Sequence, residues 1–108
     1  ISVAGLRTFL LTNLIRSGDG FAWRVNLATI VANMPAIEGF TLADAQPSSV
    51  RSLFLRGSRS EYINDDGAQA VAQLFPNSSI ETIPNAGHWI HADQPKLLIE
   101  AVSAFLGE

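Results

Sequence analysis

The chain has 108 residues, 47% of them hydrophobic and 16% charged, which is typical of a globular domain and excludes a disordered segment. The net charge of −3 and the scattered single arginines leave no basic surface for binding a nucleic acid. Cysteine is absent, which excludes disulfides and thiolate metal sites and fits a cytoplasmic protein. No apolar run is long enough to span a membrane and no signal-peptide pattern opens the sequence, so we expect no membrane partner.

Residues 1–40 form the first part of the sequence, which is helical, irregular and rich in large apolar groups. Apolar residues at helical spacing predict a first helix with one apolar face: Leu6, Phe9, Leu10 and Leu14. A turn over 17–20 and a short extended stretch over 21–25 follow. A second helix is predicted to begin after the capping residue Asn26 and to end before Pro35. The chain starts with Ile1 in helical periodicity, so we expect a piece of a longer polypeptide.

Residues 41–49, "TLADAQPSS", read as a linker, and residues 50–108 then follow a different pattern. "VRSLFLRG" predicts a strand buried on both faces that ends at Gly57. Next come a helix capped by Asn64, a second strand at "IETIP", and a last helix for which Asp93 is a candidate cap. This order predicts the α/β class, with a parallel βαβα unit. Because two parallel strands are hardly stable alone, the sheet is incomplete within this chain, and its other strands must come from polypeptide outside it or from a second copy.

Two loops are expected to carry chemistry, because ligand and catalytic groups of open α/β sheets collect beyond the carboxyl ends of the strands. "GSRSEYI" follows the first strand and "NAGHWIH" follows the second. If the strands are parallel neighbours, both loops lie at one edge of the sheet. Ser60 or Glu61 would then approach His88.

The motifs "SLFLRGSRSEYI" and "FPNSSIETIPNAGHWIHADQPKLLIEAVSAFL" resemble the C-terminal end of an α/β-hydrolase, which commonly finishes with a strand, a Gly-His loop, a downstream proline and a closing helix. The chain is most similar to the small lidded esterases of the YbfF type, whose lid carries a Trp-Arg pair like Trp23-Arg24. The resemblance implies a helical lid or cap segment over residues 1–40 and the last core strands and helices over 50–108.

By this resemblance His88 is the general base, which takes the proton of a serine nucleophile and later activates water. No Gly-x-Ser-x-Gly motif occurs in the sequence, which fits a chain that begins after the nucleophile. Ser60 stands where many of these hydrolases place an aspartate, and in the YbfF-type group the acid comes from an earlier strand. We therefore expect Ser60 to be a supporting hydroxyl near His88 and the acid to lie outside the chain, with Glu61 as the alternative acid.

An acyl pocket is predicted from apolar residues, since such sites are mostly apolar. Its candidates are Phe21, Trp23, Met34 and Trp89. His91 is three residues from His88, but no third ligand stands at a recognisable spacing, so we expect no metal site and a packing or substrate-lining role for His91.

The resemblance implies hydrolysis of a small-molecule carboxylic ester or thioester through an acyl-serine intermediate, without a cofactor. The chain alone is expected to be inactive, because it lacks the nucleophile. Two alternatives stay open. One is another chemistry of the fold, such as dehalogenation or carbon–carbon bond hydrolysis. The residue at the nucleophile position, the serine of the Gly-x-Ser-x-Gly elbow, would distinguish these chemistries. The other is a non-catalytic binding or assembly module that pairs its sheet edge with a partner.

Overall fold

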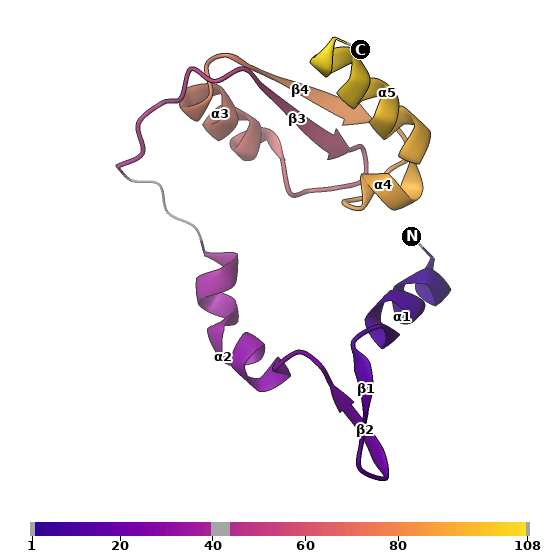
Figure 1. Cartoon of the computed structure of the whole chain (residues 1–108). Helices are drawn as coiled ribbons and strands as arrows, with labels where there is room; N and C mark the ends of the chain where they lie inside the picture. Colours follow the sequence, from indigo (N-terminus) through magenta and orange to yellow (C-terminus); the bar gives the residue numbers. More distant parts are fainter. Residues whose placement is uncertain (1, 40–43, 108) are drawn as a thin grey trace. The chain divides into compact units, whose positions relative to one another are not determined.

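The computed structural model describes residues 2–39 and 44–107 and divides into two compact units, Ser2–Ala43 and Asp44–Glu108 (Figure 1). We call them the N-terminal unit and the C-terminal unit and describe each by itself. Residues 1, 40–43 and 108 lie outside the described residues, and with them the first part of the predicted linker. The rest of that linker, residues 44–49, forms neither helix nor strand.

The N-terminal unit begins with helix α1 (Val3–Leu11), followed by the hairpin strands β1 (Leu14–Ser17) and β2 (Gly20–Trp23). The strands pair antiparallel, with Leu14 opposite Trp23 and Ser17 opposite Gly20. The prediction of a helix that includes Leu14 was therefore wrong. Leu14 continues the helical spacing, but the tight turn through Gly18, at φ 58°, reverses the chain and gives this segment a strand partner.

Helix α2 (Leu27–Glu38) completes the N-terminal unit. Its predicted cap is confirmed, because the Asn26 side chain accepts a hydrogen bond from the Thr29 N–H at 3.0 Å. Its predicted end is wrong: Pro35 lies inside the helix. Proline removes one helical N–H donor and disfavours a helical residue before it, but the helix continues for another turn and ends where the Gly39 N–H donates to the Pro35 carbonyl.

The C-terminal unit contains strand β3 (Ser52–Gly57), helix α3 (Asp65–Leu74), strand β4 (Ser78–Ile83), the short helix α4 (Ile90–Asp93) and helix α5 (Pro95–Leu106). The two strands are parallel and in register from Ser52 opposite Ser78 to Gly57 opposite Ile83. This confirms the parallel βαβα unit, to which α4 is an addition that the sequence did not predict. Because both strands end together, the loops that follow them emerge at one edge of the sheet.

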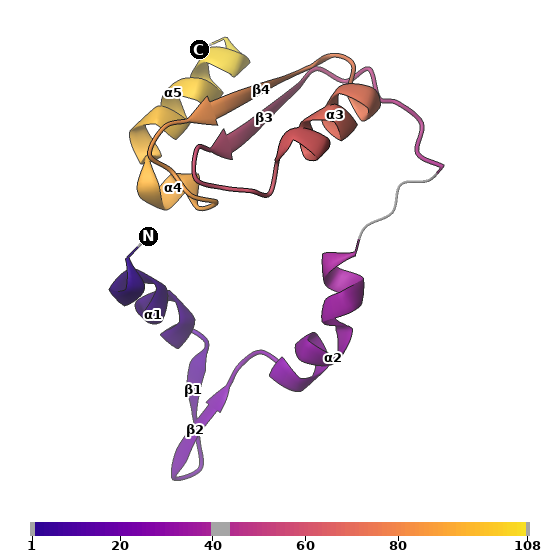
Figure 2. The same cartoon turned by 180° about the vertical axis from the view of Figure 1, so that it is seen from behind.

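Helices α3 and α5 cover opposite faces of the strand pair (Figures 1 and 2). Alternation along β3 separates the two faces. Phe54 points to the α3 face, where its ring lies 5.2 Å from that of Phe75. Leu55 points to the α5 face and packs against the core, which consists of Ile83, Ala86, Ile90 and Ala101. The side chains of β3 are only half-buried, so its predicted burial on both faces is not reached among the described residues, where β4 is its one neighbouring strand.

The two long helices of this unit begin differently. Asn64 caps α3 as predicted, since its side chain accepts from the Gly67 N–H at 2.9 Å. Asp93 does not cap α5, which is preceded by Gln94 and starts with Pro95. Proline at a first helical position needs no N–H partner and has a suitable φ, so the helix can start there without a side-chain cap. No helix in the described part of the chain is long and apolar enough to cross a membrane.

Candidate active site

The loops that leave β3 and β4 are joined by hydrogen bonds at the edge of the sheet. The Ser58 N–H donates to the Ile83 carbonyl and the Arg59 N–H to the Ala86 carbonyl, both at 2.9 Å. The Arg59 side chain donates to the Asn85 carbonyl, also at 2.9 Å. Hydrogen bonds between residues that are distant in the sequence thus fix the backbone just before His88.

Gly57, the last residue of β3, lets these two loops approach each other. A Cβ atom built at this position would overlap the carbonyl oxygens of Ala86 and Gly87 and lie 2.7 Å from the Ala86 carbonyl carbon. These are backbone atoms, which cannot rotate away as the end of a side chain can. The close approach therefore requires glycine at position 57.

His88 lies in a short loop between two buried residues. Ala86 is fully buried, and Ile90, the first residue of α4, is 8% exposed. The turn that leads into the loop passes through Asn85 at φ 54°, a left-handed conformation that asparagine tolerates better than most residues. The Gly87 N–H donates to Asp93 Oδ2 at 2.8 Å. The loop is thus anchored on both sides of His88, while the His88 side chain is exposed.

The imidazole of His88 is in contact with the ring of Tyr62, with the ring centroids 4.2 Å apart and the planes tilted by 38°. His88, Tyr62 and Ser60 line one small cavity of about 80 Å³. The Ser60 hydroxyl accepts a weak hydrogen bond from the Tyr62 N–H at 3.4 Å. The structure therefore brings Ser60 to the same cavity as His88, and the Tyr62 ring lies against the imidazole of His88.

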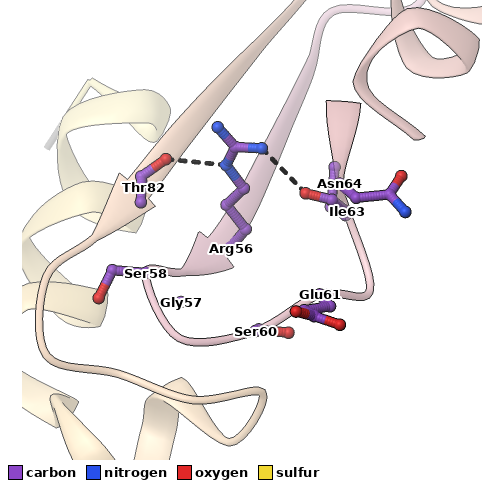
Figure 3. A pocket seen from close by; sticks show the side chains of 8 residues that line it. All are labelled: Arg56, Gly57, Ser58, Ser60, Glu61, Ile63, Asn64 and Thr82. Carbon is purple, nitrogen blue, oxygen red and sulfur yellow. Dashed lines mark hydrogen bonds between the residues drawn. The ribbon is translucent and has the colours of Figure 1, made fainter. Parts of the chain in front are cut away.

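Glu61 lines a different and wider cavity of about 480 Å³, on the side of Arg56 and Asn64 (Figure 3). There the Arg56 side chain bridges the Thr82 hydroxyl and the Ile63 carbonyl, each at 2.9 Å. Glu61 does not line the His88 cavity, whereas Ser60 lines both. Of the two residues singled out in this loop, only Ser60 lines a cavity together with the histidine.

The second histidine, His91, lies on α4 with its side chain exposed, and its ring centroid is 6.2 Å from that of the half-buried Trp89. Within the described residues no group of three or more His, Asp or Glu side chains could hold a metal ion. The other candidate pocket residues belong to the N-terminal unit. Phe21 is 65% exposed, Trp23 is 46% exposed and Met34 is half-buried.

Four residues of this site were not recognised from the sequence: Gly57, Arg59, Tyr62 and Asp93. The only signal for Tyr62 was its place in the loop after β3, beside Ser60 and Glu61. Asp93 was noted, but as a helix cap. The close approach at Gly57 and the pairing of Arg59 with Asn85 depend on the parallel register, so no local pattern marks them.

No family model matches the chain. It is 42% identical over 106 residues to the sn-1-specific diacylglycerol lipase ABHD11 of Mus musculus, a match that covers 98% of this chain and 34% of that protein. It is 29% identical over 104 residues to the esterase YbfF of Escherichia coli strain K12, covering 96% of the chain and 39% of that protein. The chain thus spans little more than a third of the length of these curated relatives.

Solved structures agree with these relatives. A marine microorganism esterase superposes with a TM-score of 0.86 at 39% identity, over 97% of this chain and 41% of that one. E-2-(acetamidomethylene)succinate hydrolase, at a TM-score of 0.74 and 15% identity, shares the fold. The chain therefore belongs to the α/β-hydrolase superfamily. Within that superfamily it corresponds to the C-terminal portion and is similar to the esterases of the YbfF type.

Proposed function

We propose that this chain supplies the catalytic histidine, His88, of a serine hydrolase that cleaves carboxylic esters or thioesters through an acyl-serine intermediate. The observation that carries the proposal is the place of His88. Its exposed side chain lies just beyond the carboxyl end of β4, on a loop whose backbone is held on both sides. Relatives that match nearly the whole chain are named esterase or lipase, which supports an ester as the substrate class.

In the proposed mechanism the imidazole of His88 accepts the proton of the serine hydroxyl as the serine attacks the ester carbonyl. It then gives that proton to the leaving alcohol or thiol. In the second half of the cycle it accepts a proton from water as the water attacks the acyl-serine, and it gives that proton to the serine oxygen as the acid is released. Imidazole suits all of these transfers, because its ordinary pKa lies near working pH. The serine is supplied by polypeptide outside this chain, since the sequence has no Gly-x-Ser-x-Gly motif.

The acid that orients His88 is also proposed to lie outside the chain. Ser60 lines the His88 cavity and would support the ring, whereas Glu61, the alternative acid, faces the wider cavity beside Arg56. Ser60→Ala is therefore expected to lower kcat by about tenfold, and Glu61→Gln to leave it within about twofold. A loss with Glu61→Gln comparable to that of a triad member would assign the acid to Glu61.

We further propose that residues 1–40 form a lid and that Phe21, Trp23, Met34 and Trp89 contribute to an acyl pocket. What supports this is their chemistry: they are large apolar side chains, of which Phe21 and Trp23 are exposed within their unit. Replacing Trp23 or Phe21 by alanine should raise KM for long acyl chains more than for acetyl esters. An equal change for all chain lengths would count against the pocket.

The central test uses the complete hydrolase, by which we mean this chain joined to the rest of the α/β-hydrolase core. On p-nitrophenyl esters from acetate to octanoate, His88→Ala should lower kcat/KM by about a thousandfold or more. His91→Ala is the matched control, since it removes a second exposed histidine three positions away, and should leave kcat within about twofold. Full activity in His88→Ala would refute the proposal.

The same assay on the isolated chain should show no turnover, because the nucleophile is missing. Robust hydrolysis that depends on His88 would show a second catalytic apparatus within these residues. The alternative chemistries of this fold, dehalogenation and carbon–carbon bond hydrolysis, are tested on their own substrates. An aspartate at the elbow of the complete protein would favour the dehalogenase. A non-catalytic assembly module would instead form a stable dimer in light scattering and hydrolyse nothing.

A further inference from the structure

We propose that Asp93 is a positioning residue for His88, which acts by holding the Gly87 peptide group from which the histidine follows. This inference rests on the proposed function and extends it to a residue without a role in the proton transfers. Asp93 is half-buried at the end of α4, and its Oδ2 accepts the Gly87 N–H at 2.8 Å. The bond closes a ring of seven residues, 87–93, that contains His88.

The peptide group between Ala86 and Gly87 is held at both of its polar atoms. Its carbonyl, that of Ala86, accepts the Arg59 N–H at 2.9 Å, and its N–H, that of Gly87, donates to Asp93. The next carbonyl back, that of Asn85, accepts from the Arg59 side chain at 2.9 Å. With both ends bonded, this peptide plane cannot rotate without breaking a hydrogen bond. The direction in which the chain enters His88 is therefore fixed by Arg59 on one side and by Asp93 on the other.

Asp93 is suited to this task by its place and its charge. Helix α4 turns the chain back, with the Asp93 N–H bonded to the Trp89 carbonyl at 3.0 Å, so the carboxylate returns to Gly87 across one short turn. A Cβ at Gly87 would lie 3.3 Å from Asp93 Oδ2, which shows how closely the two residues approach. Hydrogen bonds to a carboxylate are roughly twice as strong as neutral ones. A capping role at α5 does not explain this carboxylate, because Gln94 and Pro95 begin that helix.

The test compares Asp93→Ala and Asp93→Asn in the complete hydrolase on p-nitrophenyl butyrate, with active sites counted by a fluorophosphonate. Glu100→Ala, which removes an exposed carboxylate from α5, is the matched control. Misplacement of a catalytic group by about 1 Å lowers rates by up to about a hundredfold. We therefore expect Asp93→Ala to lower kcat per titrated site by about 10- to 100-fold with KM within about twofold. Asp93→Asn keeps an acceptor oxygen and should lose only about threefold.

A second measurement reads the hydrogen bond itself. Amide hydrogen exchange at Gly87 should become faster in Asp93→Ala and stay at the wild-type rate in Glu100→Ala. If Asp93→Ala does not fold, Asp93→Asn is the deciding variant. Faster amide exchange at Gly87 together with a reduced kcat in Asp93→Asn would support the proposal. Wild-type values of both would refute it. An Asp93→Ala enzyme with wild-type kcat per titrated site, or one in which only the number of titrated sites falls, would also refute it. So would equal losses in Asp93→Ala and Asp93→Asn.

His88→Ala, measured in the same series, separates this inference from the proposed function. If His88→Ala keeps wild-type activity, the proposed function fails, and with it the role of Asp93. If His88→Ala is inactive while Asp93→Ala retains its full kcat, His88 remains the catalytic base and the positioning role alone is wrong.

Discussion

The hydrogen bonds within the N-terminal unit differ in range from those within the C-terminal unit. In the N-terminal unit, side-chain hydrogen bonds to the backbone join residues three or four positions apart, as between Ser2 and Gly5 or Asn33 and Thr29. In the C-terminal unit, side chains join residues as far apart as 28 positions, as between Asn77 and Ser49, and 26 positions separate Arg59 from Asn85. Local bonds stabilise single helices, whereas long-range bonds fix one strand or loop against another. A histidine that must be placed to within a fraction of an ångström needs the second kind.

The burial of apolar side chains also differs between the two units. The C-terminal unit has a small core that includes Ile83, which is 2% exposed. In the N-terminal unit no described residue is buried, and large apolar side chains such as Val3 and Val31 are 74% and 68% exposed. Apolar surface on this scale is typical of a face that meets other protein or a ligand. The comparison predicts that equivalent substitutions have unequal effects in the two units.

The largest effect is expected from Gly57→Ala. Because the new Cβ would overlap backbone atoms of Ala86 and Gly87, one of the two loops must move. We expect a loss of about 3–5 kcal/mol in the free energy of unfolding. In the complete hydrolase, kcat/KM should also fall by at least about tenfold, since the displaced loop carries His88. Urea unfolding and the p-nitrophenyl ester assay measure the two effects.

Gly20→Ala in β2 is the matched control, since a Cβ there meets nothing within 4 Å. It should change stability by no more than about 0.5 kcal/mol. Similar losses at positions 57 and 20 would mean that glycine flexibility, and not the close approach of two loops, determines the cost.

These loops also show what could and could not be predicted from the sequence. The two parallel strands, α3 and the caps Asn26 and Asn64 were predictable, because hydrophobic spacing and capping residues act locally. Leu14 was assigned to a helix because helical spacing alone does not reveal a strand partner that follows a turn. The Asp93–Gly87 bond was missed because an acidic residue shortly before a helix resembles a cap. Contacts that depend on strand register have no signature in a single segment.

A smaller effect is expected from removing apolar side chains at matched positions. Ile83→Ala empties a site in the core and should lower the free energy of unfolding by about 3 kcal/mol. Val31→Ala, on the exposed surface of α2, should change it by about 0.5 kcal/mol or less. Both are measured by urea unfolding of the complete hydrolase, because two parallel strands are hardly stable alone. If Val31→Ala is instead strongly destabilising there, the apolar surface of the N-terminal unit is covered in the complete protein.

Asn64→Ala and Asn26→Ala should each destabilise the helix that the asparagine caps by about 1 kcal/mol, because each substitution removes an acceptor for a helical N–H. The readouts differ between the units. Asn64 caps α3, whose C-cap residue Phe75 packs on the sheet, so its loss should lower global stability. Asn26→Ala should instead speed amide exchange within α2 alone. Asn33→Ala, which removes a side chain that donates to the Thr29 carbonyl of the same helix, is the control and should not destabilise α2.

The smallest effects are expected from the two exposed ring contacts, one in each unit. Tyr62→Ala removes the ring that lies against His88, and since such pairs contribute about 0.5–1.5 kcal/mol, kcat of the complete hydrolase should fall about 3- to 10-fold. Tyr62→Phe keeps the ring and should keep kcat within about twofold. Arg16→Ala removes a cation over Phe21 in the hairpin and should leave kcat unchanged, with at most about 1 kcal/mol lost from hairpin stability. A kcat in Tyr62→Phe as low as in Tyr62→Ala would move the role from the ring face to the hydroxyl. The contact between Tyr62 and His88 would then be a consequence of the loop's path and would not hold the imidazole in place.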